Sequence, residues 1–242
     1  MPEPFTLLLL PGLLCDADVW EPEMAALGGA AACRVADYRH ATSIGAMAEL
    51  ALRGAPPRFA LAGHSMGGRV ALEIVRRSPE RVARLALLDT GYQPRAPGAA
   101  GEEEARQRRR FVELARTQGM RAMGEEWLRG MVHPDRLADR TLMDRMLAMI
   151  ERQKLEDYQG QIGALLDRPD AVAVLGRIAC PTLVACGRQD TWSPPARHEG
   201  MAALIPGCRL DIFERCGHMS TLERPDAVVA SLRRWLECRT PS

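Results

Sequence analysis

The chain has 242 residues, of which 47% are hydrophobic and 26% are charged, a balance that is typical of a globular domain and excludes a disordered or fibrous protein. Its 32 basic and 31 acidic side chains leave a formal charge of +1, so it lacks the positive charge of nucleic-acid-binding proteins, and we expect no nucleic-acid partner. The seven cysteines contain no C-x-x-C pair, which favours reduced thiols and predicts neither a metal site nor a redox dithiol.

The apolar stretch at residues 5–15 does not resemble a signal peptide. It is interrupted by Pro11-Gly12 and preceded by Glu3 instead of basic residues. No stretch reaches the roughly 18 apolar residues that a membrane-spanning helix needs. We therefore expect a cytoplasmic protein without a membrane partner, and the sequence gives no indication of its oligomeric state.

Short apolar runs bounded by glycine, proline or charge predict strands that are buried on both faces. In chain order these runs are residues 5–10, 34–38, 59–63, 85–89, 182–186 and 209–213. Segments with helical spacing lie between or after them, at residues 44–53, 66–78, 195–204 and 225–237. Because strands and helices alternate, the sequence predicts an α/β fold with a mostly parallel sheet of about six strands flanked by helices.

Residues 92–170 contain no strand-like run and predict a helical insertion, with helices at 102–117, 120–130 and 142–154. Its first helix carries a basic cluster at residues 106 and 108–110, one turn after the three glutamates 102–104. Because such charges can pair along a helix, we interpret the cluster as a solvated helical face.

The most informative motif is Gly63-His64-Ser65-Met66-Gly67, which stands between a buried strand and a helix. This G-x-S-x-G pattern in this context is typical of a nucleophile elbow, a strained turn in which glycines prevent clashes and Ser65 projects freely. The amide of Met66, at the start of the helix, can then bind negative charge that develops on a substrate oxygen.

A nucleophilic serine needs a histidine base. Three of the five histidines, His40, His133 and His198, stand in polar surroundings and are predicted to lie at the surface. His64 adjoins Ser65, but its side chain should point away from that of Ser65. His218 follows the last strand-like run and precedes a predicted helix, so it is the candidate base.

The base needs a carboxylate, for which the sequence offers two candidates. Asp190 follows a strand and a glycine turn, and it completes the chain order Ser, Asp, His. Asp89 ends the strand after the elbow helix and is the rival. We favour Asp190 because it lies past a glycine turn instead of in the strand. Ser65, Asp190 and His218 would then each follow a different parallel strand, where ligand sites in such sheets lie.

A second oxyanion-binding amide is expected in the loop after the first strand, which contains Pro11-Gly12. Leu13 is our choice and Leu14 is the alternative, although the segment could also be a simple Pro-Gly turn.

The sequence resembles the α/β-hydrolase superfamily over most of its length. The segments that carry this resemblance are the elbow, residues 181–190, Gly217-His218 and residues 222–225. The resemblance is closest to small bacterial carboxylesterases of the pimeloyl-carrier-protein methyl esterase and enol-lactonase type. It implies an eight-stranded sheet with a helical cap, a Ser65–Asp190–His218 triad and an oxyanion hole from the Leu13 and Met66 amides.

Two departures from the family pattern stand out. Pro11-Gly12 replaces the His-Gly of many relatives. The sequence begins almost at the strand that is third in the family, so we expect no first hairpin and about six strands. The resemblance makes residues 92–170 the cap over a core of residues 1–91 and 171–242. Because the nucleophile is Ser65 instead of an aspartate, it argues against epoxide hydrolases and haloalkane dehalogenases.

These observations predict a serine hydrolase that cleaves a carboxylic ester or thioester of a small or medium acyl substrate, without metal or organic cofactor. Leu14 follows the predicted oxyanion residue Leu13, Trp192 lies near Asp190, and Met219 follows His218. All three are candidates for substrate binding or for packing. One alternative is a carbon–carbon bond hydrolase or pyruvate-eliminating enzyme, which inward-facing cap arginines would favour. Another is a non-catalytic small-molecule-binding protein with the same fold.

Overall fold

The computed structural model describes residues 5–238 and contains a six-stranded sheet in the order β2-β1-β3-β4-β5-β6. All neighbouring strands are parallel. The strands are β1 (Thr6–Leu10), β2 (Ala32–Val35), β3 (Phe59–His64), β4 (Val82–Leu88), β5 (Thr182–Gly187) and β6 (Arg209–Phe213). This sheet confirms the predicted fold class and the number of strands.

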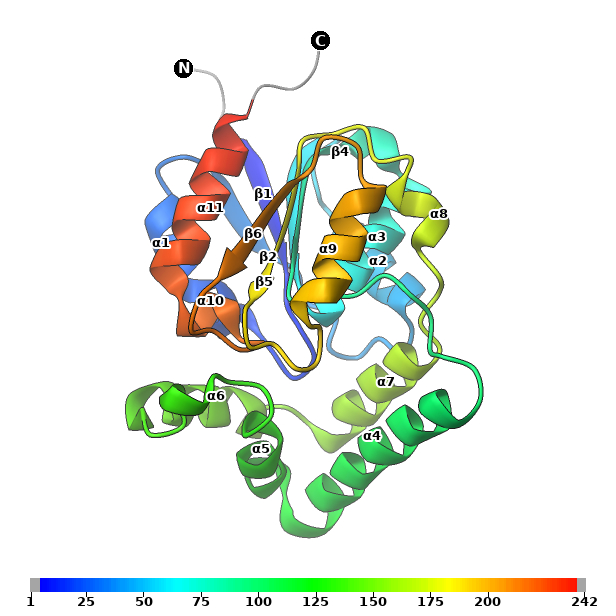
Figure 1. Cartoon of the computed structure of the whole chain (residues 1–242), viewed down its shortest axis with the longest axis vertical. Helices are drawn as coiled ribbons and strands as arrows, with labels where there is room; N and C mark the ends of the chain where they lie inside the picture. Colours follow the sequence, from blue (N-terminus) through cyan, green and yellow to red (C-terminus); the bar gives the residue numbers. More distant parts are fainter. Residues whose placement is uncertain (1–4, 239–242) are drawn as a thin grey trace.

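Helices cover both faces of the sheet (Figure 1). One face carries α1 (Glu21–Leu27), α10 (Ser220–Glu223) and α11 (Pro225–Glu237), and the other carries α2 (Ile44–Leu52), α3 (Met66–Arg77), α8 (Val172–Leu175) and α9 (Pro195–Leu204). Because helices shield both faces, every residue of β3 and β5 is buried. Short 3₁₀ helices, Ala17–Trp20, Pro79–Arg81 and Pro134–Arg136, complete the connections.

Most of the chain between β4 and β5, before α8, forms a separate group of helices below the sheet in Figure 1. These are α4 (Ala99–Gln118), α5 (Met120–Leu128), α6 (Arg140–Glu151) and α7 (Leu155–Leu166). Helix α4 packs against α5 and α7, and α5 packs against α6. The proposed domain limits of 92–170 for the cap and 1–91 with 171–242 for the core stay a prediction.

The second strand differs most from its predicted position, because it spans Ala32–Val35 where the sequence predicts residues 34–38. As an edge strand it pairs only with β1, and its residues are exposed or half-buried, so it lacks the apolar pattern of a central strand. After it, the Tyr38 hydroxyl donates to the Pro11 carbonyl and fixes the chain beside the end of β1.

None of the helices in the part of the chain that the structure describes is both long and apolar enough to cross a membrane.

Candidate active site

Ser65 occupies a sharp turn between β3 and α3 with φ 53° and ψ −116°, a conformation that side-chain-bearing residues rarely adopt. Two glycines permit the turn, because a Cβ at Gly63 would collide with the Gly67 carbonyl, and a Cβ at Gly67 with the Leu10 carbonyl. The Ser65 amide donates to the Leu88 carbonyl (2.8 Å), so β4 helps to hold the strained residue in place.

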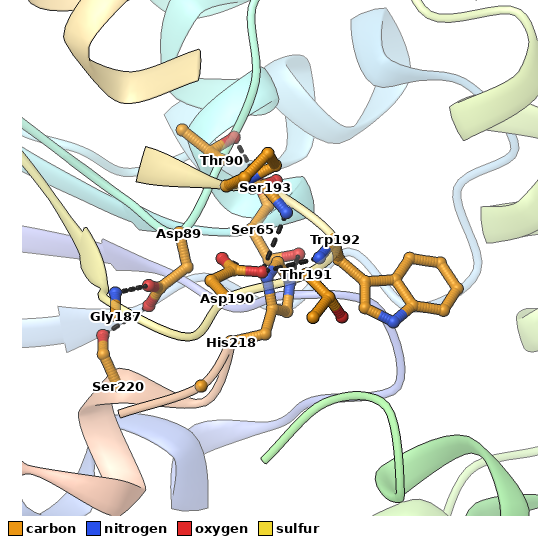
Figure 2. A network of polar contacts seen from close by, with 12 residues as sticks. Ser65, Asp89, Thr90, Gly187, Asp190, Thr191, Trp192, Ser193, His218 and Ser220 are labelled. Atoms are coloured by element: carbon orange, nitrogen blue, oxygen red, sulfur yellow. Dashed lines mark hydrogen bonds and ion pairs between the residues drawn. The ribbon is translucent and has the colours of Figure 1, made fainter. Parts of the chain in front are cut away.

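The structure brings Ser65, His218 and Asp190 into one hydrogen-bonded chain (Figure 2). His218 Nε2 lies 2.8 Å from Ser65 Oγ, and His218 Nδ1 lies 2.8 Å from Asp190 Oδ2. The other carboxylate oxygen, Oδ1, accepts the amides of Trp192 and Ser193, both at 2.8 Å. Asp190 is thereby fixed on both oxygens, which orients the imidazole toward the serine.

The electrostatic surroundings of His218 favour its protonated form. Burial of the ring lowers its pKa, but the charge of Asp190 and the hydrogen bond from Nδ1 outweigh burial, so the pKa of His218 is raised above its usual value. This arrangement stabilises the imidazolium that would form when the ring takes the serine proton.

Asp89, the rival carboxylate, is close to this chain but is not bonded to His218. Its Oδ1 accepts the Gly187 amide (3.0 Å), and its Oδ2 accepts the Ser220 hydroxyl. Burial and the charge of Asp190 raise its pKa. Asp190 is therefore the carboxylate that contacts His218, whereas Asp89 bonds to Gly187 at the end of β5 and to Ser220 at the start of α10.

The loop that carries His218 is held by a residue that the sequence analysis did not identify. Glu223 accepts the amides on both sides of His218, from Gly217 (3.0 Å) and Met219 (3.1 Å), and also the amide of His133 (2.7 Å). No spacing rule singles out such a residue, because it acts through backbone amides.

A second connection joins the same loop to the helical insertion. The His218 amide donates to the Met131 carbonyl (2.6 Å), and the His218 carbonyl accepts Nε2–H of His64 (2.9 Å). Burial and the nearby His218 lower the pKa of His64 to about 4, so His64 is neutral near pH 7 and acts as a hydrogen-bond donor.

The two amides predicted to bind an oxyanion are both available. Within residues 5–238, neither the Leu13 amide nor the Met66 amide has a protein acceptor. The Leu14 amide, by contrast, donates to Gln161 Oε1 (3.0 Å). The contacts therefore favour Leu13 over the alternative Leu14.

A cavity of about 360 Å³ lies between the sheet and the helical insertion, and its lining includes Ser65, His218, Leu13 and Met66. Trp192 lines it as well, as the sequence analysis proposed for a substrate-binding residue. The other two substrate-binding candidates, Leu14 and Met219, are absent from the lining, and each is only 1% exposed within the hydrophobic core. The structure corrects these two assignments to packing residues.

The solvated face predicted for the basic cluster is wrong at one position. Arg106, Arg109 and Arg110 are exposed, but the Arg108 side chain is only 12% exposed and lines the cavity. It is joined there by Arg69, Arg168 and Arg197 from other segments.

The prediction that three histidines lie at the surface holds fully only for His40, whose side chain is 74% exposed. His133 is mostly covered, and His198 on α9 is completely buried. His198 Nε2 accepts the Thr90 amide (2.9 Å), and burial lowers its pKa to about 4, so it is a neutral structural residue. His198 is buried because it lies on the inner face of α9. Its neighbours in the sequence are polar, so the sequence alone does not indicate this burial.

No group of three histidine, cysteine, aspartate or glutamate side chains within residues 5–238 is arranged to hold a metal ion.

A nucleophile elbow, a neighbouring histidine and carboxylate, and a parallel sheet with an inserted helical segment define the class of α/β hydrolases. The model of the alpha/beta hydrolase family matches residues 7–231, and the chain belongs to this family. Its relatives include named esterases, as the resemblance in the sequence predicts.

Three proteins illustrate these relatives. The chain is 28% identical to a pimeloyl-[acyl-carrier protein] methyl ester esterase of Nitrosomonas europaea over 193 residues, which are 78% of this chain and 75% of that protein. It is 30% identical over 178 residues, 70% of this chain and 59% of the other, to a 2-hydroxy-6-oxononadienedioate/2-hydroxy-6-oxononatrienedioate hydrolase of Cupriavidus pinatubonensis. Among solved structures, a thermophilic esterase from Thermogutta terrifontis with malate bound superposes with a TM-score of 0.85 at 27% identity, covering 96% of this chain and 89% of that one.

Proposed function

We propose that this hydrolase cleaves a carboxylic ester or thioester through an acyl-enzyme on Ser65. The observation that carries the proposal is the chain of 2.8 Å contacts from Ser65 through His218 to Asp190. The amides of Leu13 and Met66, which have no acceptor within the described part of the chain, line the same cavity as Ser65 and His218. The similarity to named esterases supports the same chemistry.

The contacts assign one role to each group. His218 Nε2 accepts the proton of Ser65 as the Ser65 oxygen attacks the substrate carbonyl. The amides of Leu13 and Met66 stabilise the oxyanion of the tetrahedral intermediate. His218 then returns its proton to the departing alcohol or thiol, and a water molecule activated by the same ring hydrolyses the acyl-enzyme.

The decisive test removes the nucleophile. Ser65→Ala should reduce the turnover of a short-chain ester such as p-nitrophenyl butyrate by about 10⁶-fold, the scale of loss of a triad nucleophile. It should also abolish labelling by a fluorophosphonate probe. Ser78→Ala, at the other end of α3, is the matched control and should retain both. Equal turnover by the Ser65→Ala protein would refute the proposal, and failure of the parent protein to label would favour the non-catalytic binding protein.

A second function, hydrolysis of a carbon–carbon bond, is favoured by the inward-facing Arg108 and by the similarity to the hydrolase of Cupriavidus pinatubonensis. Two turnover rates separate the two reactions. One is the hydrolysis of a 2-hydroxy-6-oxo-dienoate, monitored through the loss of its absorbance, and the other is the hydrolysis of simple esters.

A further inference from the structure

Four arginines from different parts of the chain line the cavity that contains Ser65. Arg69 lies on α3, Arg108 on α4, Arg168 after α7, and Arg197 on α9. Clustered cations of this kind repel one another, so the structure must offset them internally or leave them for an anion.

Arg168 is offset internally. Its five N–H groups are matched by five acceptors. Nε donates to the Gln93 carbonyl (3.3 Å), and Nη1 donates to Glu104 Oε1 and the Leu165 carbonyl (both 2.7 Å). Nη2 donates to Glu104 Oε2 (2.8 Å) and the Pro94 carbonyl (3.4 Å). Arg168 therefore has no donor left for a ligand and acts as a brace for the cavity wall.

The other three arginines keep free donors. Among the residues that the structure describes, Arg108 donates only through Nε, to Glu104 (2.9 Å), and its guanidinium lies 5.7 Å from the Trp192 ring centre. Arg69 and Arg197 each give one N–H group to a backbone carbonyl, at 2.9 and 3.0 Å. Across residues 5–238, neither of these two has a carboxylate partner within 4.0 Å.

Arg69 and Arg197 also converge on one point. A Cβ atom built on Gly91 would lie 2.7 Å from Arg69 Nη2 and 3.0 Å from Arg197 Cδ. Burial, together with the charges of the other three arginines, lowers the pKa of Arg69, and this outweighs the opposite effect of the Glu104 charge.

The carboxylates near the cavity do not neutralise this group. Glu104 is shared between Arg108 and Arg168. Asp89 also lines the cavity, but its oxygens already accept the Gly187 amide and the Ser220 hydroxyl. Even when Asp89 is counted with Glu104, two carboxylates face four guanidiniums, which leaves the arginine group with excess positive charge.

Resting on the proposed ester hydrolysis, we propose that the substrate carries a carboxylate, which Arg69, Arg108 and Arg197 bind while Ser65 attacks its ester carbonyl. Guanidinium groups suit this task because their planar N–H pairs match the two oxygens of a carboxylate. The volume of about 360 Å³ fits a small molecule, so the substrate class is a short half-ester of a dicarboxylic acid.

The first experiment compares two esters that differ in charge and hardly in shape. Monomethyl glutarate carries the carboxylate, and methyl glutaramate replaces it with a neutral amide. The parent enzyme should hydrolyse the anionic ester with a kcat/KM about tenfold or more above that of the neutral one, a margin expected for charge-assisted hydrogen bonds. Arg69→Gln, Arg108→Gln and Arg197→Gln should each lose most of this preference.

Arg106→Gln is the matched control, because Arg106 lies on the same helix as Arg108 with its side chain 60% exposed, outside the cavity lining. It should keep the preference of the parent enzyme. Equal kcat/KM for both esters in the parent enzyme, or equal loss of preference in Arg106→Gln, would overturn the inference.

A binding measurement separates this inference from the proposed reaction. Calorimetry should detect glutarate binding to the Ser65→Ala protein, weakened about tenfold or more when Arg108→Gln is added. If no ester is hydrolysed but glutarate binds in this way, the reaction is wrong and the anion site stands. If glutarate does not bind, or inorganic phosphate binds more tightly, the carboxylate assignment is wrong.

Discussion

The replacement Asp190→Asn tests the geometry of the candidate site most directly, because the direction in which the new amide must face can be worked out. Oδ1 of Asp190 accepts the amides of Trp192 and Ser193, so the asparagine oxygen must take that place. Its NH₂ group then faces His218 Nδ1. A donor at this point forces the proton of the ring onto Nε2, and that tautomer cannot accept the proton of Ser65.

The expected loss in kcat is about 10⁴-fold, the scale for an orienting aspartate that becomes an amide in a serine–histidine–aspartate triad. The pH profile should move as well. Asp190 raises the pKa of His218, and the base must be neutral to act, so activity is present above this pKa and is lost as the pH falls through it. Without the carboxylate the pKa of His218 falls, and the acidic limb of the profile should shift to lower pH.

The matched control is Asp89→Asn, which also removes a buried carboxylate but leaves the 2.8 Å contact between Asp190 and His218 intact. Its kcat should fall far less than that of Asp190→Asn. Steady-state kinetics on one ester between pH 5 and 9, with thermal unfolding of each variant, make the comparison. If Asp89→Asn proves the more damaging of two folded variants, Asp190 is not the orienting carboxylate.

Three further substitutions probe the supports of the site. Glu223→Gln, which weakens the bonds to the amides around the histidine loop, should lower kcat by about 10²-fold with a smaller change in KM; an unchanged kcat would mean that other contacts hold the loop. Gly67→Ala places a methyl group against the Leu10 carbonyl and should reduce the free energy of unfolding in urea by about 1–3 kcal/mol, whereas a neutral effect would show that the elbow can relax. Gln161→Leu leaves the buried Leu14 amide without its acceptor and should cost about 1–3 kcal/mol in the same assay, and no loss would mean that water replaces the side chain.

The central sheet could be predicted well because its strands are covered on both faces. Continuous apolar runs such as those of β3 and β5 arise only where both sides of a strand are buried. The edge strand β2 differs from its predicted position because its residues are exposed or half-buried and carry no continuous apolar run, so its position depends on pairing with β1. Short helices such as α1 and α8 were not predicted, because they contain too few turns to show a helical period.

The glycines that surround Ser65 carry a local signal, because a strained turn allows only a few residue types. Asp190 and His218 were placed from their positions after strands, since parallel strands end at one edge of the sheet. The misplaced residues share another cause. Leu14 and Met219 are adjacent to site residues in sequence, but the direction of each side chain is set by packing, which sequence adjacency does not determine.

Arg108 shows how a site residue can be hidden in a charged cluster. The buried positions of α4 are Gly101, Ala105, Phe111 and Ala115, which form one stripe along the helix. Arg108 lies on this stripe, three residues after Ala105, whereas Arg106 lies on the opposite side and pairs with Glu103. A cation on the inner face of a helix loses hydration and must find a negative partner. Glu104 offsets the charge of Arg108 only in part, because this carboxylate is shared with Arg168. Under the proposed carboxylate binding, the substrate supplies the rest of this negative charge. Helical phase, and not the local density of charge, therefore distinguishes the inward-facing Arg108 from the solvated Arg106.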